Sequence, residues 1–156
     1  MRLQLRIPPV AWIAAYGGAM WAVDRVAPLQ QVIGSPASKS GWLLIMAGAA
    51  VIATAVMQFR RARTTVDPMH PAKASALVRS GIFAYSRNPM YLGMAVGLGG
   101  WALLLGSLSP WLVVASFAPL LTWLQILPEE AVLSTLFGHD YDEYCARVGR
   151  WIGCKG

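Results

Sequence analysis

Charged residues are scarce in this 156-residue chain. Lys, Arg, Asp and Glu make up only 13% of the residues, and seven of them are acidic, whereas hydrophobic residues reach 56% and the mean hydropathy is +0.51. A typical soluble domain carries about 25% charged residues, and burial in an ordinary core cannot hide this much apolar surface. The composition therefore excludes a typical soluble domain and predicts a single integral membrane domain.

Cysteine and histidine are also rare, and this limits redox and metal chemistry. The two cysteines, Cys145 and Cys154, have no metal-binding spacing to a histidine and do not form a disulfide framework. Both lie in the basic C-terminal segment, which we place in the reducing cytoplasm, so we interpret them as free structural thiols. His70 and His139 are solitary, and we predict no metal site.

Basic residues outnumber acidic ones, giving a formal net charge of +6. They cluster in loops beside apolar segments, which is typical of orientation by the positive-inside rule and of contact with anionic lipid headgroups. No nucleic-acid-binding motif accompanies them. The predicted partner is the lipid bilayer, and no nucleic acid is expected.

Four long apolar runs predict four transmembrane helices, since about 20 apolar residues span a bilayer core. The first run imitates a signal peptide, but it continues into Asp24-Arg25 without a small-residue cleavage pattern, so we expect it to be retained. The predicted fold class is all-α, an integral membrane bundle of four transmembrane helices with short C-terminal interfacial helices. The four spans are Pro9–Val26, Gly41–Phe59, Pro89–Leu108 and Trp111–Leu127.

The longest polar connection, Arg60–Arg87, holds six basic residues against the single acid Asp67. This charge bias places it in the cytoplasm together with both termini. Within it, Pro71–Val78 has the signals of a short helix, with proline at its first position. Two further short helices are expected after Pro128, which should stop or bend the fourth span, and the second of them should start at Asp140.

Two features inside the spans leave alternatives open. Gly93, Gly97 and Gly100 lie on one face of the third helix, which indicates tight helix packing, close approach of a ligand near Gly93, or both at different heights. Pro119 in the fourth helix indicates a kink, of which an opening for substrate is a possible consequence.

Two polar stretches, Arg87–Gly93 and Glu129-Glu130, should meet on the same membrane face after one helical hairpin. Glutamates beside a membrane are costly unless they are paired, hydrated or used. Periodicity alone leaves two interpretations: a polar pocket, or a helix boundary held by salt bridges.

The ordered motifs of residues 64–151 resemble the isoprenylcysteine carboxyl methyltransferase family, which also resembles the phospholipid methyltransferases. That family has arginine-histidine-proline-x-tyrosine-x-glycine, followed one hairpin later by a glutamate pair. Matching segments occur in the same order and at family spacing, and an ordered set is far more specific than one motif. They are Leu77-Val78-Arg79-Ser80-Gly81, Arg87-Asn88-Pro89-Met90-Tyr91-Leu92-Gly93, Glu129-Glu130 and Phe137-Gly138-His139-Asp140-Tyr141.

The resemblance implies an S-adenosylmethionine-dependent methyltransferase of the bacterial inner membrane, with the cofactor held at the cytoplasmic face. Residues 1–59 would then be a two-helix scaffold and residues 60–156 a cofactor-binding core, in one domain of residues 1–156. The acceptor would be lipophilic or small: a prenylcysteine-like carboxylate, a phospholipid amine or a thiol. The implied cofactor-binding residues are Ser75, Leu77, Val78, Phe83, Asn88, Pro89, Tyr91, Glu129 and Glu130, and the substrate-facing ones are Arg87 and Gln125.

Two positions depart from the family pattern. Asn88 replaces the family histidine and keeps a hydrogen-bonding side chain that cannot titrate. Gln125 stands where prenylcysteine-specific members have an arginine, so it offers no positive charge to a carboxylate acceptor. Two alternatives remain: an NADPH-dependent membrane reductase of the sterol-reductase type, whose similar stretch continues differently after the last span, and a non-catalytic membrane scaffold protein. No general base is identified.

Overall fold

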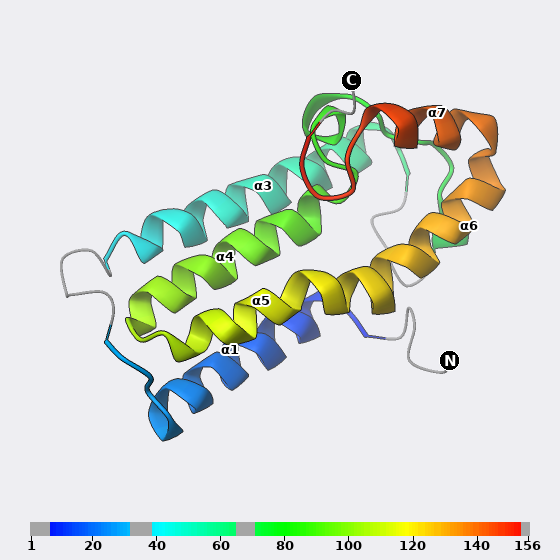
Figure 1. Ribbon diagram of the computed structural model, residues 1–156. Helices are drawn as coiled ribbons and strands as arrows, with labels where there is room; N and C mark the ends of the chain where they lie inside the picture. Colours follow the sequence, from blue (N-terminus) through cyan, green and yellow to red (C-terminus); the bar gives the residue numbers. More distant parts are fainter. Residues whose placement is uncertain (1–6, 32–38, 65–70, 154–156) are drawn as a thin grey trace.

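The computed structural model describes residues 7–31, 39–64 and 71–153, and the chain folds there into helices (Figure 1). No strand forms among the described residues, and the β bridge between Gln31 and Ser107 is isolated, so the all-α prediction is confirmed. The long helices are α1 (Pro9–Val26), α3 (Gly41–Arg61), α4 (Pro89–Leu105), α5 (Ser109–Leu121), α6 (Leu127–Phe137) and α7 (His139–Arg147). Between them lie the short 3-10 turns η1 (Pro71–Lys73) and η2 (Gly81–Ala84) and the π-helical turn η3 (Thr122–Ile126).

The predicted helix over Pro71–Val78 is wrong, because only Pro71–Lys73 forms a helical turn. The backbone N–H groups of Ser75 and Ala76 instead donate to the Thr64 hydroxyl, over 3.0 and 3.3 Å. A residue outside the segment therefore takes the donors that a longer helix would need.

Of the two outcomes predicted at Pro128, a stop or a bend, the structure shows the bend, because α5, η3 and α6 form one continuous, bent helix (Figure 1). The Leu127 N–H bonds the Thr122 carbonyl, five residues back, which is the π-helical spacing. Pro128 then falls in the first turn of the resumed α-helix, a position at which proline is common. Pro119 lies one turn before the bulge, in agreement with the predicted distortion.

The hairpin of α3 and α4 is packed backbone against backbone. A Cβ added to Gly93 would lie 2.6 Å from the Gly48 carbonyl oxygen, and one added to Gly100 would lie 2.5 Å from the Gly41 oxygen. Small residues that admit such close approach are typical of packing between membrane helices. The packing interpretation therefore holds for Gly93 and Gly100.

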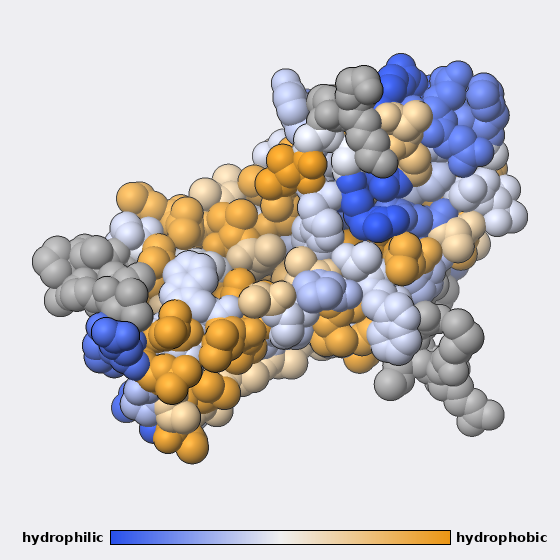
Figure 2. Space-filling model, in the orientation of Figure 1, coloured by the Kyte–Doolittle hydropathy of each residue, from blue (hydrophilic) through white to orange (hydrophobic). Residues whose placement is uncertain are grey.

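Two helical segments are long and apolar enough to cross a membrane: Gly41–Arg61 and the continuous helix Ser109–Phe137. Only 11% and 28% of their most apolar windows are buried, so they are not the core helices of a soluble protein. On the face shown in Figure 2, hydrophobic side chains predominate along the bundle, and hydrophilic ones gather at the end that carries α7, with a smaller group at the opposite end. The chain is an integral membrane protein. The other two predicted spans fall short, α4 by its length of 17 residues and α1 because Asp24 and Arg25 lower its hydropathy.

Candidate functional site

A cavity of about 90 Å³ opens at the end of the bundle that carries α7. Its wall combines one carboxylate, from Glu129, with six aromatic rings and a set of aliphatic side chains. The lining residues are Pro9, Phe59, Pro71, Ala74, Ala76, Leu77, Val78, Phe83, Asn88, Pro89, Met90, Tyr91, Glu129, Leu133, Phe137, Tyr141 and Tyr144. Segments far apart in the chain therefore meet around one hollow.

The structure brings most of the predicted cofactor-binding residues to this cavity and leaves a few outside it. Seven of them line it: Leu77, Val78, Phe83, Asn88, Pro89, Tyr91 and Glu129. Ser75 does not, because its hydroxyl donates to the Arg63 carbonyl over 3.0 Å. Glu130, Arg87 and Gln125 are also absent from the lining.

Several lining residues are not among the predicted site residues, above all Phe59, Tyr141 and Tyr144. A signal for the two tyrosines exists, because they lie three residues apart and share one face of a short amphipathic helix. Phe59 gives no such signal, since it lies at the end of a long apolar run. Its ring meets that of Phe83 edge to face, with centroids 4.8 Å apart.

Tyr91 and Glu129 connect α4 to α6 inside the cavity wall. The Tyr91 hydroxyl donates to Glu129 Oε2 over 3.2 Å. Pro89 begins α4, so Tyr91 falls in the first turn, at the level where α6 begins across the hairpin. Gln125 is fully buried one turn before Glu129, beside the same hydroxyl. The predicted meeting of the two polar stretches is therefore observed.

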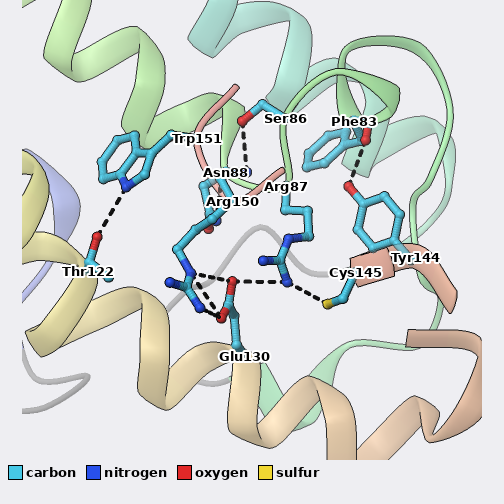
Figure 3. Close-up of polar contacts among 10 residues, drawn as sticks. All are labelled: Phe83, Ser86, Arg87, Asn88, Thr122, Glu130, Tyr144, Cys145, Arg150 and Trp151. Atoms are coloured by element: carbon cyan, nitrogen blue, oxygen red, sulfur yellow. Dashed lines mark hydrogen bonds and ion pairs between the residues drawn. The ribbon is translucent and has the colours of Figure 1, made fainter. Parts of the chain in front are cut away.

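Glu130 does not line the cavity, and it binds two arginines (Figure 3). Arg150 holds both carboxylate oxygens, with Nε–Oε1, Nε–Oε2 and Nη2–Oε2 distances of 3.0, 3.1 and 2.7 Å. Arg87 Nη1 lies 3.2 Å from Oε1 and also contacts the free thiol of Cys145. The side chains of Arg87 and Glu130 are only 8% and 13% exposed, and that of Arg150 is 35% exposed. The salt-bridge interpretation thus fits Glu130, whereas Glu129 faces the cavity.

This ion cluster fastens residues 148–153, which we call the C-terminal strap, across the start of α4. The Arg87 N–H bonds the Gly149 carbonyl over 3.1 Å, and the Asn88 side-chain amide donates to the Arg150 carbonyl over 3.0 Å. The Trp151 indole N–H donates to the Thr122 hydroxyl over 3.1 Å, at the π-helical turn (Figure 3). Asn88 therefore lines the cavity while its amide donor is engaged with the strap.

Two further polar groups are fixed where α7 covers the cavity. The Tyr144 hydroxyl donates to the Phe83 carbonyl over 2.7 Å, and burial raises the pKa of Tyr144, so the phenol stays neutral and keeps donating. Burial also raises the pKa of Tyr141.

The hydrogen bonds from Arg150 to Glu130 raise the pKa of the Arg150 guanidinium. The cavity is thus built from neutral aromatic rings beside one carboxylate, a combination that suits a cationic ligand.

Comparison with known proteins gives two kinds of match. The sequence model of the phospholipid methyltransferase family matches residues 37–140. A protein of Haemophilus influenzae described as uncharacterized is 38% identical over 63 residues, which cover 40% of this chain and 100% of that protein. Protein-S-isoprenylcysteine O-methyltransferase of Schizosaccharomyces pombe is 35% identical over 80 residues, which cover 49% of this chain but only 32% of that enzyme. No solved structure matches the chain significantly.

Proposed function

The chain belongs to the phospholipid methyltransferase family, and from its cavity we propose that this membrane methyltransferase takes its methyl group from S-adenosylmethionine. The observation that carries the proposal is the single hollow at which residues of all four motifs converge, with Glu129 among aromatic rings. The family resemblance expected from the motifs is confirmed by the family match and by the partial similarity to the yeast enzyme.

The residues present fit this cofactor. Its sulfonium is a cation, and aromatic faces such as those of Phe83 and Tyr91 attract cations without hydrating them. The Glu129 carboxylate can accept hydrogen bonds from ribose hydroxyls or from the amino group. The enclosed space of about 90 Å³ is smaller than the ~300–1,000 Å³ of typical ligand pockets. We therefore expect the cavity to enclose one part of the donor, with the remainder at its open side.

The donor supplies an electrophilic methyl group on positively charged sulfur; the acceptor forms the new bond while the carbon–sulfur bond breaks and its electron pair stays on sulfur. The chain contributes mainly positioning and exclusion of water, which supply much of the rate in such transfers. Tyr91 orients Glu129 by its hydrogen bond, and the rings of Phe137 and Tyr144 keep the wall apolar. No residue of the cavity is assigned as a base.

We propose that the chain crosses the bacterial inner membrane four times, with both termini and the cavity on the cytoplasmic side. α1 and α4 lie in the same bundle as the two longer spans (Figure 1). At 1.5 Å per residue α4 covers about 25 Å, and a bilayer adjusts to helices somewhat shorter than its core. Arg60 and Arg61 are exposed at the cavity end of α3, as the positive-inside rule requires. The N-terminal arginines and Cys154 lie outside the described residues.

The acceptor is proposed to be a lipophilic or small molecule, among which a phospholipid amine or a thiol is favoured over a prenylcysteine-like carboxylate. Gln125, which replaces the arginine of prenylcysteine-specific members, lies buried beside Tyr91 and Glu129. A negative acceptor would therefore meet a carboxylate without a compensating cation from Gln125.

The test is direct. Calorimetry on purified, folded protein should show binding of S-adenosylmethionine and of S-adenosylhomocysteine, and thermal unfolding should shift upward with either of them. NADPH should leave the unfolding temperature unchanged, and a shift with NADPH alone would support a reductase instead. Glu129→Gln should weaken binding of the donor, whereas the exposed Glu143→Gln serves as a matched control. Mass spectrometry of lipid extracts incubated with labelled methyl donor identifies the acceptor.

A further inference from the structure

A second hollow, of about 590 Å³, lies between α1, α3 and α4 within the apolar part of the bundle. We call it the apolar groove. All of its lining residues are hydrophobic or glycine, and none is charged: Ile13, Ala14, Gly17, Gly18, Trp21, Ile45, Ala49, Ile52, Gly93, Met94, Gly97, Leu98 and Trp101. Such a lining suits a hydrocarbon chain and offers no charged partner to a ligand.

The apolar groove lies next to the cavity that contains Glu129, along the same faces of α1 and α4. On α1, Pro9 lines the cavity and Ile13, four residues on, lines the groove. On α4, Pro89 lines the cavity and Gly93, again four residues on, lines the groove. Residues four apart lie above one another on the same face of a helix.

On α3 the relation is the same, with Phe59 in the cavity wall and Ile52 in the groove wall, seven residues or two turns apart. All three helices therefore present one common face to both hollows. A molecule that reaches from one hollow to the other stays between the same three helices.

The glycines of the groove are of two kinds. A Cβ at Gly93 would lie 2.6 Å from the Gly48 carbonyl oxygen of α3, so helix packing explains this glycine. A Cβ at Gly17, Gly18 or Gly97 would meet no atom within 4 Å. Packing against a neighbouring helix therefore does not require glycine at these three positions. All three line the groove, and because they have no side chain they leave its space open.

Trp101 crosses from α4 to α1 at the level of Gly17. Its indole N–H donates to the Gly17 carbonyl over 3.2 Å, so its polar atom is satisfied within the protein. The ring itself lines the groove beside the bare glycines. The indole therefore offers an apolar surface to a chain that enters from the cavity.

We propose that the apolar groove binds the hydrocarbon chain of the methyl acceptor, with the reactive end of that acceptor at the cofactor cavity. This inference rests on the proposed methyl transfer for the identity of the ligand, though occupancy of the groove is measurable without it. From Gly93 to Trp101 the groove follows eight residues of α4, about 12 Å at 1.5 Å per residue. An extended chain advances about 1.2 Å per bond, the value for a polypeptide of three bonds per residue. The groove therefore accommodates about ten carbon–carbon bonds.

Photolabelling tests this length directly. Straight-chain alcohols of six to sixteen carbons, each with a diazirine at the chain end, are added to the purified full chain in lipid nanodiscs, and the labelled residues are mapped by mass spectrometry. The uncharged headgroup avoids repulsion from Glu129. Short chains should label the level of Gly93 and Met94, and longer ones the level of Trp101 and Trp21. Labelling spread evenly over groove residues and bilayer-facing residues such as Trp42 and Leu112, at every length, would overturn the proposal.

Gly97→Leu provides the blocking variant, because Gly97 lines the groove and a Cβ at this position meets no atom within 4 Å. Gly97 lies four residues, or about 6 Å, beyond Gly93, so labelling at Trp101 should fall at least tenfold. Gly99→Leu is the matched control: it makes the same change on the same helix, its Cβ also meets nothing within 4 Å, and it does not line the groove. Equal labelling of Trp101 in Gly97→Leu and wild type would contradict the proposal.

Activity gives a second readout once an acceptor is known. Each methylene buried in the groove should raise kcat/KM about threefold to fourfold. In wild type, kcat/KM should stop rising when the acceptor chain is about ten bonds long, and in Gly97→Leu it should stop rising about five bonds earlier. Affinity for S-adenosylmethionine, measured by calorimetry, should be unchanged in this variant. If labelling depends on chain length but S-adenosylmethionine does not bind, the proposed function is refuted and the groove proposal stands. If S-adenosylmethionine binds but labelling does not depend on chain length, the groove proposal is refuted and the proposed function stands.

Discussion

Adjacent glutamates in one helical turn should have separable effects, one on the cofactor and one on the fold. Glu129 faces the cavity and accepts one hydrogen bond, from Tyr91, whereas Glu130 faces Arg87 and Arg150. Glu129→Gln keeps an acceptor oxygen for Tyr91, so it should cost at most about 1 kcal/mol of stability. It removes the carboxylate from the aromatic wall, and we expect affinity for S-adenosylmethionine to fall at least tenfold.

Glu130→Gln should do the opposite. It leaves the buried guanidinium of Arg87 without its counter-ion. Breaking a fully buried ion pair costs about 3–5 kcal/mol, and an exposed pair is worth about 0–1 kcal/mol. With Glu130 13% and Arg87 8% exposed, the loss should be about 2–3 kcal/mol. Affinity for the donor, measured below the unfolding temperature, should stay within about threefold of wild type.

A double-mutant cycle isolates the Glu130–Arg150 contact. Arg150 is about one third exposed, so solvent screening should limit its coupling with Glu130 to about 1 kcal/mol, even though its contact is bidentate. The cycle compares Glu130→Gln, Arg150→Met and the double variant by denaturant unfolding in detergent micelles, with calorimetry of the donor on each. A larger loss of affinity in Glu130→Gln than in Glu129→Gln would refute this division of roles.

Two further substitutions test the packing of the bundle and the cover of the cavity. Gly93→Ala should destabilise the fold by about 1–3 kcal/mol, because its Cβ would lie 2.6 Å from the Gly48 carbonyl oxygen, whereas Gly17→Ala, which meets nothing, should be neutral in the same unfolding assay. Tyr144→Phe should lower stability by about 1–2 kcal/mol, since the Phe83 carbonyl loses its donor. Because the pKa of Tyr144 is raised, this contribution is fully present below the ordinary tyrosine pKa of about 10 and is lost only as pH rises through the higher folded value. The difference between wild type and Tyr144→Phe should therefore be equal at pH 7 and pH 9, and unequal values would show that another group is responsible.

Helix positions could be predicted from the sequence where residues within the helix itself, such as a proline at its start, determine its ends. The sequence predicts the first helix at Pro9–Val26, as the structure has it, because proline marks its start and a charged pair marks its end. Tyr91 and Glu129 were expected to meet because a hairpin of two equal spans returns the chain to the same face. These conclusions depend on periodicity and on length, which are local properties.

The failures have a tertiary cause. Pro128 predicts a stop or a bend from local chemistry, and the helix does not stop there: the π-helical turn before Pro128 shifts the hydrogen-bond register, and the helix continues. One of the two partners of Glu130 is Arg150, twenty residues on and beyond another helix, and no periodic pattern connects them. Ser75 was assigned to the cavity wall, but its hydroxyl is engaged by the Arg63 carbonyl. Each of these contacts forms only when the strap and the connection fold back onto the bundle.

The π-helical turn acts as an inserted residue within an otherwise α-helical count. Successive residues of an α-helix are about 100° apart, so one extra residue in the turn Thr122–Ile126 decides which of two neighbouring carboxylates faces which side. If the same residues formed an ordinary α-helical turn, everything after it would be rotated by about that angle. Pro128 would then take the helical position that Glu129 holds now, and Glu129 would face the arginines. The rotation of the helix after the π-helical turn therefore determines which acid faces the cavity and which one faces the strap.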